Sequence, residues 1–109
     1  RINEAIGAGK KAVALLPNYY MGYTNLCRAY NDGREYETAI QNCKTALRLQ
    51  PNDGETNFYL GFAYSQLNQN ETAISHYRKA VPGLIEYTKN NPDYSDGFYL
   101  LGNTYVGLE

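Results

Sequence analysis

The sequence contains no tryptophan, a single histidine and only two cysteines, and it has no excess of either charge. Ten lysine and arginine residues stand against eleven acidic ones. The resulting net charge of −1 excludes the basic surface typical of nucleic-acid-binding and polybasic membrane-binding proteins. No apolar run approaches the ~20 residues of a membrane-spanning helix. Two cysteines are too few for the disulfide framework of a small secreted domain.

Patterns typical of catalysis and metal binding are missing as well. His76 is the single histidine, and we interpret it as a surface residue on a solvated helix face. Cys27, Cys43 and His76 lack the C-x-x-C or H-x-x-x-H spacing of a zinc site. The acidic residues are scattered, with no pair placed to act as general acid and base. We therefore expect no enzyme activity, no metal and no cofactor.

What the sequence does contain is an internal repeat of 34 residues. Shifting the chain by this length aligns identical residues over two long segments. The aligned pairs are Leu26 with Leu60, Ala29 with Ala63, Tyr30 with Tyr64, Ala46 with Ala80, and Glu-Thr-Ala-Ile at 37–40 with the same residues at 71–74. Self-similarity at a fixed period of this size indicates a repeat architecture.

Each repeat has the apolar spacing of two helices. The stripes of the first full repeat are Tyr23, Leu26, Cys27 and Tyr30, then Ala39, Cys43, Ala46 and Leu47. Turn-forming residues at 31–33 and 68–70 separate the stripes, and a proline ends each second helix. We expect Asn18, Asn52 and Asp93, which follow these prolines, to cap the next helices.

The predicted fold class is all-α, with six helices arranged as antiparallel hairpins and no strand. The helices are expected at about residues 2–16, 19–31, 35–49, 53–67, 71–90 and 94–107.

At these positions the sequence resembles the tetratricopeptide repeat family, over the whole chain. The matching residues are Tyr23, Leu26, Cys27, Tyr30, Ala39, Cys43, Ala46 and Pro51 in one unit, and Asn57, Leu60, Gly61, Tyr64, Ala73, Tyr77 and Ala80 in the next. Tyr23 and Asn57 depart from the family's tryptophan, and Cys27 departs from its glycine. The resemblance implies an α-α superhelix, or solenoid. Its units are a half repeat at 1–17, a full repeat at 18–51, a full repeat with an insertion at 52–92 and a half repeat at 93–109.

The insertion lengthens the second full unit by seven residues. Leu60 and Gly61 recur at Leu101 and Gly102, an offset of 41 rather than 34. Seven residues are close to two helical turns, so the apolar stripe rotates by only ~20° and stays in register. We predict one long helix that is kinked at Pro82, the alternative being a break into two helices there.

Small residues and cysteines occupy packing positions in the pattern. Gly61 and Gly102 are expected to let two helix backbones approach closely. Cys27 and Cys43 lie on facing helices, about one turn out of step by our register. We therefore predict that they are buried reduced thiols rather than a disulfide.

The resemblance implies a concave groove lined by the first helix of each unit. The positions that would face it are Met21, Thr24, Asn25, Arg28, Asn31 and Asp32, then Glu55, Phe58, Tyr59, Phe62, Ser65 and Gln66, then Asp96, Tyr99, Leu100 and Asn103. Some family members bind acidic chaperone tails with a clamp of lysine, arginine and asparagine side chains. The nearest positions here are Thr24, Arg28, Phe62, Tyr99 and Asn103. Because only Arg28 is cationic, we do not expect that mode of binding.

The candidate site is therefore an aromatic groove with a few polar groups. Its predicted residues are Asn25, Arg28, Phe58, Phe62, Tyr99 and Asn103. Such a surface suits an extended segment or an amphipathic helix with apolar side chains. The alternative is that the aromatic rings merely pack between neighbouring first helices.

These features predict a protein-interaction adaptor that holds a peptide or a partner protein. The alternatives are a homo-oligomerising structural scaffold and a recruiting arm of a larger enzyme. The last predicted helix leaves Phe98, Leu101, Tyr105 and Leu108 without a second helix to cover them. We therefore expect the chain to be part of a longer array, or to pair its ends with other copies.

Overall fold

The computed structural model describes residues 1–93 and 95–109 of the chain, and these residues form helices and loops without a strand. The helices are α1 (Ile2–Leu15), α2 (Tyr20–Asp32), α3 (Tyr36–Leu49), α4 (Gly54–Gln66), α5 (Asn70–Asn90) and α6 (Ser95–Gly107). The predicted all-α fold is confirmed, and the predicted helix ends lie within one residue of the observed ones. The predicted start of the last helix, residue 94, lies outside the described residues.

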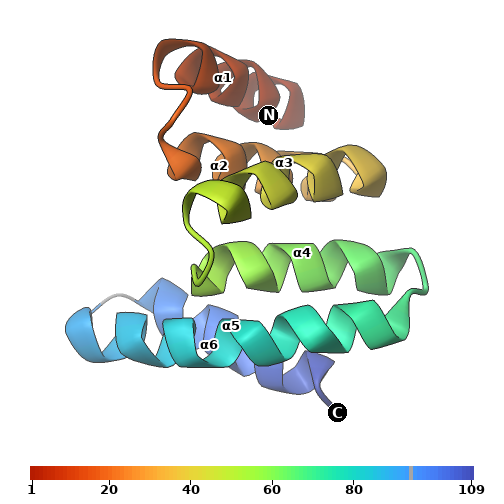
Figure 1. The fold of residues 1–109 in the computed structure, drawn as a ribbon, viewed down its shortest axis with the longest axis vertical. Coiled ribbons are helices and arrows are strands. Elements are labelled where there is room, and N and C mark those ends of the chain that lie inside the picture. Colours follow the sequence, from red (N-terminus) through yellow and green to blue (C-terminus); the bar gives the residue numbers. More distant parts are fainter. Residues whose placement is uncertain (94) are drawn as a thin grey trace.

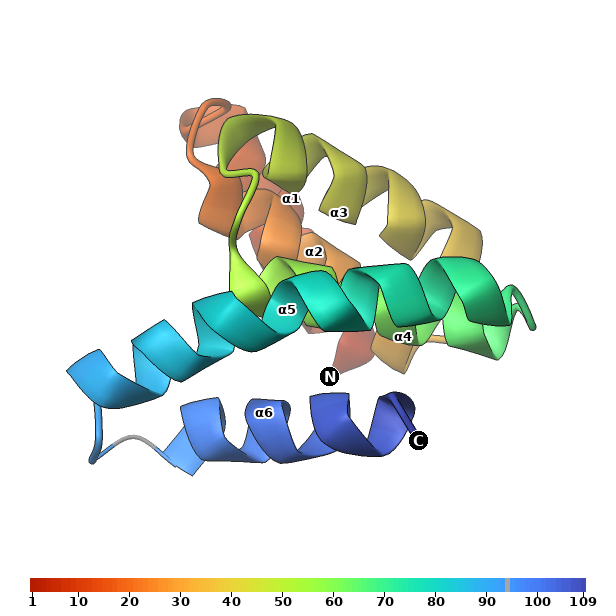
Figure 2. The ribbon, with the colours of Figure 1, turned by 60° about the horizontal axis from the view of Figure 1, so that its bottom comes forward.

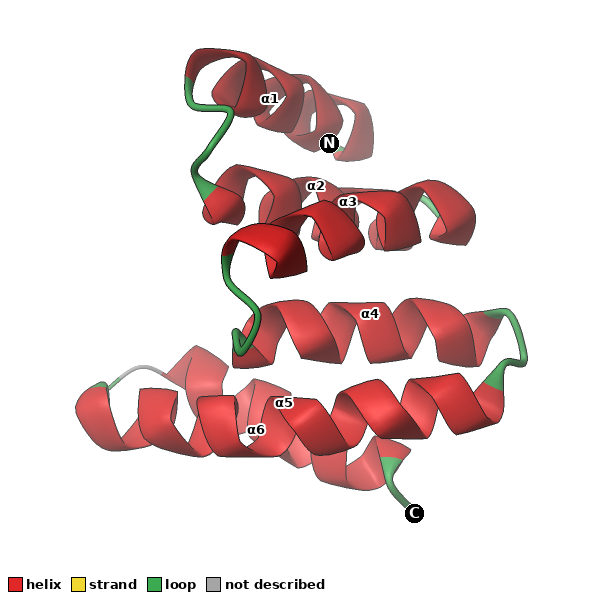
Figure 3. Cartoon of the chain, in the orientation of Figure 1, coloured by secondary structure: helices red, strands yellow, loops and turns green. Residues whose placement is uncertain are grey.

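The helices are stacked as antiparallel hairpins that are joined by short loops (Figures 1 and 3). Each helix packs against the next one in the chain. In addition α2 contacts α4, and α4 contacts α6, whereas α3 makes no comparable contact with α5. The even-numbered helices therefore lie closer together than the odd-numbered ones, which curves the stack and gives α2, α4 and α6 a common inner face.

Small side chains in the core permit the close helix packing. Ala39, Ala46, Ala63 and Ala80 have no exposed surface. At Gly61, an added Cβ atom would lie 2.9 Å from the ring of Tyr77 on α5. This confirms that a close approach of α4 and α5 requires the glycine.

Gly102 behaves differently from its counterpart in the repeat. An added Cβ atom there would meet nothing within 4 Å among the described residues. The close packing predicted at this glycine is therefore wrong for the described chain, because no helix covers that side of α6.

The long helix α5 runs through Pro82 without a break, so the prediction of one continuous helix is confirmed. Its C-terminal half extends beyond the start of α4 and lies alongside α6 (Figures 1 and 2). Pro82 itself is exposed, so its ring lies on the solvent side of the helix. The inserted heptad thus lengthens the surface on which α6 packs.

The predicted helix caps are partly wrong. The helix α4 is capped by Asp53, whose carboxylate accepts a hydrogen bond from the Thr56 backbone N–H at 2.9 Å, and not by Asn52. The helix α2 begins after Tyr19 without a side-chain cap, so Asn18 does not cap it. The helices α2 and α4 therefore begin one residue later than we expected, at Tyr20 and Gly54. The cap predicted at Asp93 borders residue 94, which lies outside the described residues.

The cysteine prediction is also wrong, because Cys27 on α2 and Cys43 on α3 form a disulfide. Their Cα atoms are 5.3 Å apart, within the range that a disulfide requires. The helices of the hairpin bring the two positions opposite each other rather than one turn out of step. The equivalent pair in the next repeat, Gly61 and Tyr77, is likewise in contact.

Candidate partner-binding groove

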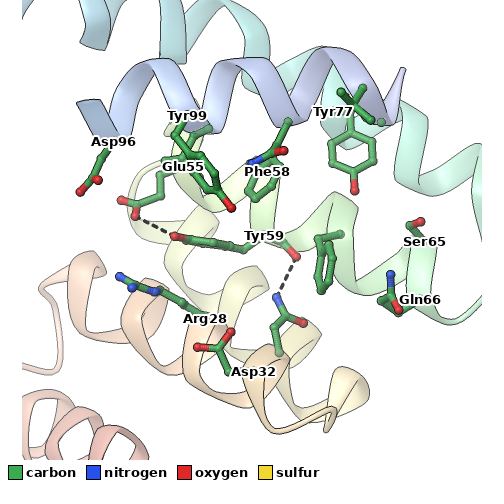
Figure 4. Close-up of a pocket in the computed structure, with 16 residues that line it drawn as sticks. Arg28, Asp32, Glu55, Phe58, Tyr59, Ser65, Gln66, Tyr77, Asp96 and Tyr99 are labelled. Atoms are coloured by element: carbon green, nitrogen blue, oxygen red, sulfur yellow. Dashed lines mark hydrogen bonds between the residues drawn. The ribbon is translucent and has the colours of Figure 1, made fainter. Parts of the chain in front are cut away.

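The inner face of the stack contains a groove with a volume of about 590 Å³. Its walls come from α2, α4 and α6, with one contribution from α5. The lining residues are Arg28, Asn31, Asp32, Glu55, Phe58, Tyr59, Phe62, Ser65, Gln66, Tyr77, Asp96, Tyr99, Leu100, Asn103, Val106 and Gly107. Most of these residues appear with labels in Figure 4.

The groove brings together five of the six predicted site residues. They are Arg28, Phe58, Phe62, Tyr99 and Asn103. Asn25 is exposed and lines a second hollow of about 570 Å³ between α1 and α2, where Arg28 and Asp32 also lie.

Two further positions that were expected to face the groove do not line it. Met21 is half-buried outside the groove, and Thr24 is 1% exposed. The Thr24 hydroxyl lies 2.7 Å from that of Thr56 in the contact between α2 and α4. Thr24 is therefore a packing residue, because the inner helices approach each other closely at this point.

The three predicted aromatic residues differ in exposure. Phe58 is only 9% exposed, with its ring centroid 5.4 Å from that of Tyr59 and 5.9 Å from that of Tyr77. The expectation that Phe58 presents an accessible surface is wrong, because it forms part of the core beneath the groove. Phe62 is half-buried and packs edge-on against Tyr36. Tyr99 is 71% exposed and is thus the most accessible aromatic ring of the three.

Charged side chains gather at one end of the groove. Figure 4 shows Asp96, Glu55 and Arg28 near that end, with Asp32 below Tyr59. The hydroxyl of Tyr59 donates a hydrogen bond to Glu55 Oε2 at 3.2 Å. Burial, followed by the charge of Asp53, raises the pKa of the Glu55 carboxyl, whereas this hydrogen bond from Tyr59 and the charge of Arg28 lower it. Asp96 contributes the smallest increase.

Asn31 supplies an unusual polar group on the α2 wall of the groove. The residue is 5% exposed, and its Nδ2 donates a hydrogen bond to the backbone oxygen of Tyr59 at 3.1 Å. That bond fixes the orientation of the amide. The opposite atom, Asn31 Oδ1, is buried and has no hydrogen-bond partner. Buried acceptors without a donor are uncommon and costly in folded proteins.

A hydrogen-bond network holds the N-terminal ends of α2 and α4 together. Asp53 accepts hydrogen bonds from the hydroxyls of Thr56 at 2.6 Å and Tyr20 at 3.3 Å. Burial, followed by the charge of Asp53, raises the pKa of Tyr20 to about 12. The network fixes the spacing of two groove walls.

His76 is placed differently from the solvated position that we expected. It is half-buried between α4 and α5, its Nδ1 lies 3.1 Å from Asn57 Oδ1, and its ring stacks on Tyr64. Burial, followed by the charges of Lys79 and Lys44, lowers the pKa of His76. Asn57 occupies the family's tryptophan position, so the smaller amide leaves room for the imidazole.

Three groove residues were missed by sequence reasoning. Tyr77 comes from a second helix, and Val106 and Gly107 lie at the end of α6. The predicted positions lay on first helices alone and ended at Asn103 on the last one, which excluded all three. Tyr77 lies at an aromatic position of the repeat pattern. Its ring contacts Gly61 on α4, which explains how a side chain from α5 reaches the inner face.

The described residues offer no site for a bound metal ion. None of their histidine, cysteine and acidic side chains form a group of three or more that could hold one. None of the described helices has the length and apolar character to cross a membrane.

Comparison with known proteins identifies the repeats. Two family models described as tetratricopeptide repeat match this chain, one over residues 22–53 and the other over residues 42–75. The tetratricopeptide repeat protein 37 of Xenopus laevis is 35% identical over 72 residues. That match covers 66% of this chain and 4% of the relative, so the chain spans a small part of that protein.

Solved structures show the same fold. The TPR2B domain of yeast Sti1, in a complex with pHsp70, superposes with a TM-score of 0.76 at 17% identity, covering 96% of this chain and 83% of that one. The first TPR of Spaghetti (RPAP3), bound to the HSP90 peptide SRMEEVD, gives a TM-score of 0.73 at 20% identity, covering 98% and 81%. At these identities the likeness establishes the fold.

Proposed function

Because this chain belongs to the tetratricopeptide repeat family, we propose that it is a protein-interaction module that binds a segment of a partner protein in the groove between α2, α4 and α6. The observation that carries the proposal is a single open groove spanning three helices, with Tyr99 largely exposed within it. The volume of about 590 Å³ is in the range of protein ligand sites. We propose a binding role rather than a catalytic one.

The groove chemistry suits a segment with apolar anchor side chains. Tyr99 and Phe62 offer aromatic surface, and Asn103 lies beside them as a hydrogen-bonding group. Exposed aromatic side chains contribute strongly to interfaces because each buries a large area while losing little conformational freedom. Asn25 lies outside this groove, so we propose Arg28, Phe62, Tyr99 and Asn103 as its contact residues.

Alanine substitutions at three aromatic positions test the proposal. Tyr99→Ala and Phe62→Ala should each weaken binding of a groove ligand by about 1–3 kcal/mol, the usual cost of truncating an interface anchor. Tyr99→Ala should leave the unfolding temperature nearly unchanged. Phe58→Ala should instead lower stability by ~3–5 kcal/mol because Phe58 belongs to the core.

Tyr19→Ala is the matched control, since Tyr19 is exposed at 53% and lies outside both hollows. It should leave binding unchanged. Partners can be isolated by affinity capture with the wild-type chain and measured by calorimetry against each variant. Equal affinity of the wild-type and Tyr99→Ala chains for every captured partner would contradict binding in this groove.

A second candidate function is self-association through the outer side of α6. Phe98 and Tyr105 are 54% and 49% exposed, and the open space at Gly102 lies on the same helix. We propose that this surface packs against a further helix, which another copy of the chain can supply. Sedimentation over a range of concentrations tests it. A single monomeric species at every concentration would contradict self-association.

A further inference from the structure

We infer that the groove binds a basic segment, in which a lysine or arginine side chain reaches the carboxylates of Asp32, Glu55 and Asp96 while adjacent apolar side chains pack on Tyr99. This inference rests on the proposed function and specifies the charge of the partner. Three observations support it: the negative charge balance of the groove, the unpartnered acceptor Asn31 Oδ1 in its wall, and the aromatic rings of Tyr59 and Tyr99.

The charge balance of the lining residues is negative. Asp32 on α2, Glu55 on α4 and Asp96 on α6 contribute three carboxylates, and Arg28 is the single lysine or arginine that lines the groove. The carboxylates come from all three inner helices, so each of these walls of the groove contributes an acidic side chain. Figure 4 places Asp96 and Glu55 at the same end of the groove.

The pKa of Glu55 reflects its surroundings. Burial and then the charge of Asp53 raise it, the hydrogen bond from Tyr59 and the charge of Arg28 lower it, and Asp96 adds the smallest increase. A cationic side chain entering the groove would stabilise the charged form of Glu55. Complementary charge of this kind favours both the rate and the specificity of association.

The wall of the groove carries hydrogen-bond acceptors. Asn31 Oδ1 is buried in a residue that lines the groove, and its amide orientation is fixed by the bond to Tyr59. Carboxylate oxygens also only accept hydrogen bonds when ionised. A lysine, an arginine or a backbone N–H of an extended segment supplies hydrogen-bond donors to the carboxylates of the groove.

The aromatic rings are compatible with the same occupant. Tyr59 and Tyr99 line the groove, and Figure 4 shows both beside Glu55. A cation near the face of a tyrosine ring is attracted by the ring quadrupole. The fold neighbour that binds SRMEEVD takes a peptide with three acidic residues. The carboxylates in this groove would repel such a peptide.

A selection from random peptides tests the charge of the occupant. Short random peptides displayed on phage are selected on the 109-residue chain, and the enriched sequences are synthesised. Their affinities are measured for the wild-type chain, for Asp96→Asn and for the control Glu86→Gln. Asp96 and Glu86 are both exposed, but Glu86 lies on α5 outside the groove. Thermal unfolding verifies that the variants are folded.

The expected result is enrichment of lysine or arginine next to apolar residues. Asp96→Asn should weaken the affinity for these peptides about 3- to 10-fold, and Glu86→Gln should leave that affinity unchanged. Added salt should reduce the affinity of the wild-type chain. Selected peptides that are acidic or uncharged, and that no longer bind the Tyr99→Ala chain, would overturn the proposal of a basic segment while supporting binding in the groove. Binders that are insensitive to Tyr99→Ala and Asp96→Asn, or no binders at all, would overturn both proposals.

Discussion

Gly54 at the start of α4 and Gly83 in the middle of α5 pack against each other backbone to backbone. A Cβ atom on Gly83 would lie 2.8 Å from the backbone nitrogen of Gly54, and one on Gly54 would lie 2.6 Å from the backbone nitrogen of Leu84. Neither position has a flexible side chain that could move aside. The long helix α5 therefore crosses the beginning of α4 at a distance that only two glycines permit, directly after Pro82.

The first prediction concerns this crossing. Gly83→Ala should lower the free energy of unfolding by about 1–3 kcal/mol, because the two helix backbones must separate. The loss should occur although alanine favours a helix by ~1 kcal/mol over glycine. Urea unfolding measures the change.

Gly7→Ala is the matched control for that measurement. Gly7 lies within α1, and an added Cβ atom there meets nothing within 4 Å. Its substitution should raise stability by up to ~1 kcal/mol through helix propensity alone. Equal effects of the two substitutions would show that the contact between Gly54 and Gly83 does not limit the helix crossing.

The second prediction compares Gly61 and Gly102, which occupy the same position of the repeat. Gly61→Ala should destabilise the chain, because the new methyl group would lie 2.9 Å from the Tyr77 ring and 3.1 Å from the Ala73 carbonyl oxygen. Gly102→Ala should instead stabilise it by up to ~1 kcal/mol. Thermal unfolding of both variants is the measurement. A loss of stability in Gly102→Ala that grows with protein concentration would show that another copy packs on α6.

The third prediction concerns the disulfide between Cys27 and Cys43. The bond closes a loop with a sequence separation of 16, for which loop entropy predicts a stabilisation of about 3 kcal/mol. Urea unfolding with and without reductant should therefore differ by about that amount. Both cysteines have no exposed surface, so reduction without denaturant should be slow. Alkylation of two thiols per chain in denaturant, before any reductant is added, would contradict the bond.

Sequence periodicity was sufficient to predict the helices but not the details of their contacts. The 34-residue offset located every hairpin, and the seven-residue excess located the long α5, because both depend on spacing along the chain. The facing of Cys27 and Cys43 depends on the crossing of two helices, which spacing within each helix does not define. The structure shows that the equivalent positions of the next repeat, Gly61 and Tyr77, also face each other across two helices.

The candidate site was predictable to the same extent. Arg28, Phe62, Tyr99 and Asn103 were found because they lie off the packing stripe of their helices. Phe58 and Thr24 lie off the stripe as well, yet both are buried. The inner helices contact one another directly, so one face of each serves both as groove wall and as helix contact. Helical periodicity cannot separate these two uses of a face.

The last prediction concerns the pH dependence of stability at His76. The folded state lowers the pKa of this histidine from its ordinary value of 6.5. Between the two pKa values the unfolded chain binds more protons than the folded chain, so acid favours unfolding. The contribution of His76 to stability is therefore complete above pH 6.5 and is lost progressively as the pH falls below it. The urea midpoint should decrease as the pH is lowered through 6.5.

His76→Gln isolates this effect from the other titrating groups. The glutamine retains a hydrogen-bonding group near Asn57 but does not titrate. The raised pKa of Glu55 acts in the opposite direction, because the folded state holds that proton more tightly and gains stability as the pH falls. Since Glu55 is present in both chains, its contribution cancels in the difference between them. The midpoint of the wild-type chain should thus fall more steeply with acid than that of His76→Gln. Parallel pH profiles of the two chains would mean that the half-buried imidazole is protonated equally in the folded and unfolded states, and that its contact with Asn57 does not depend on its charge.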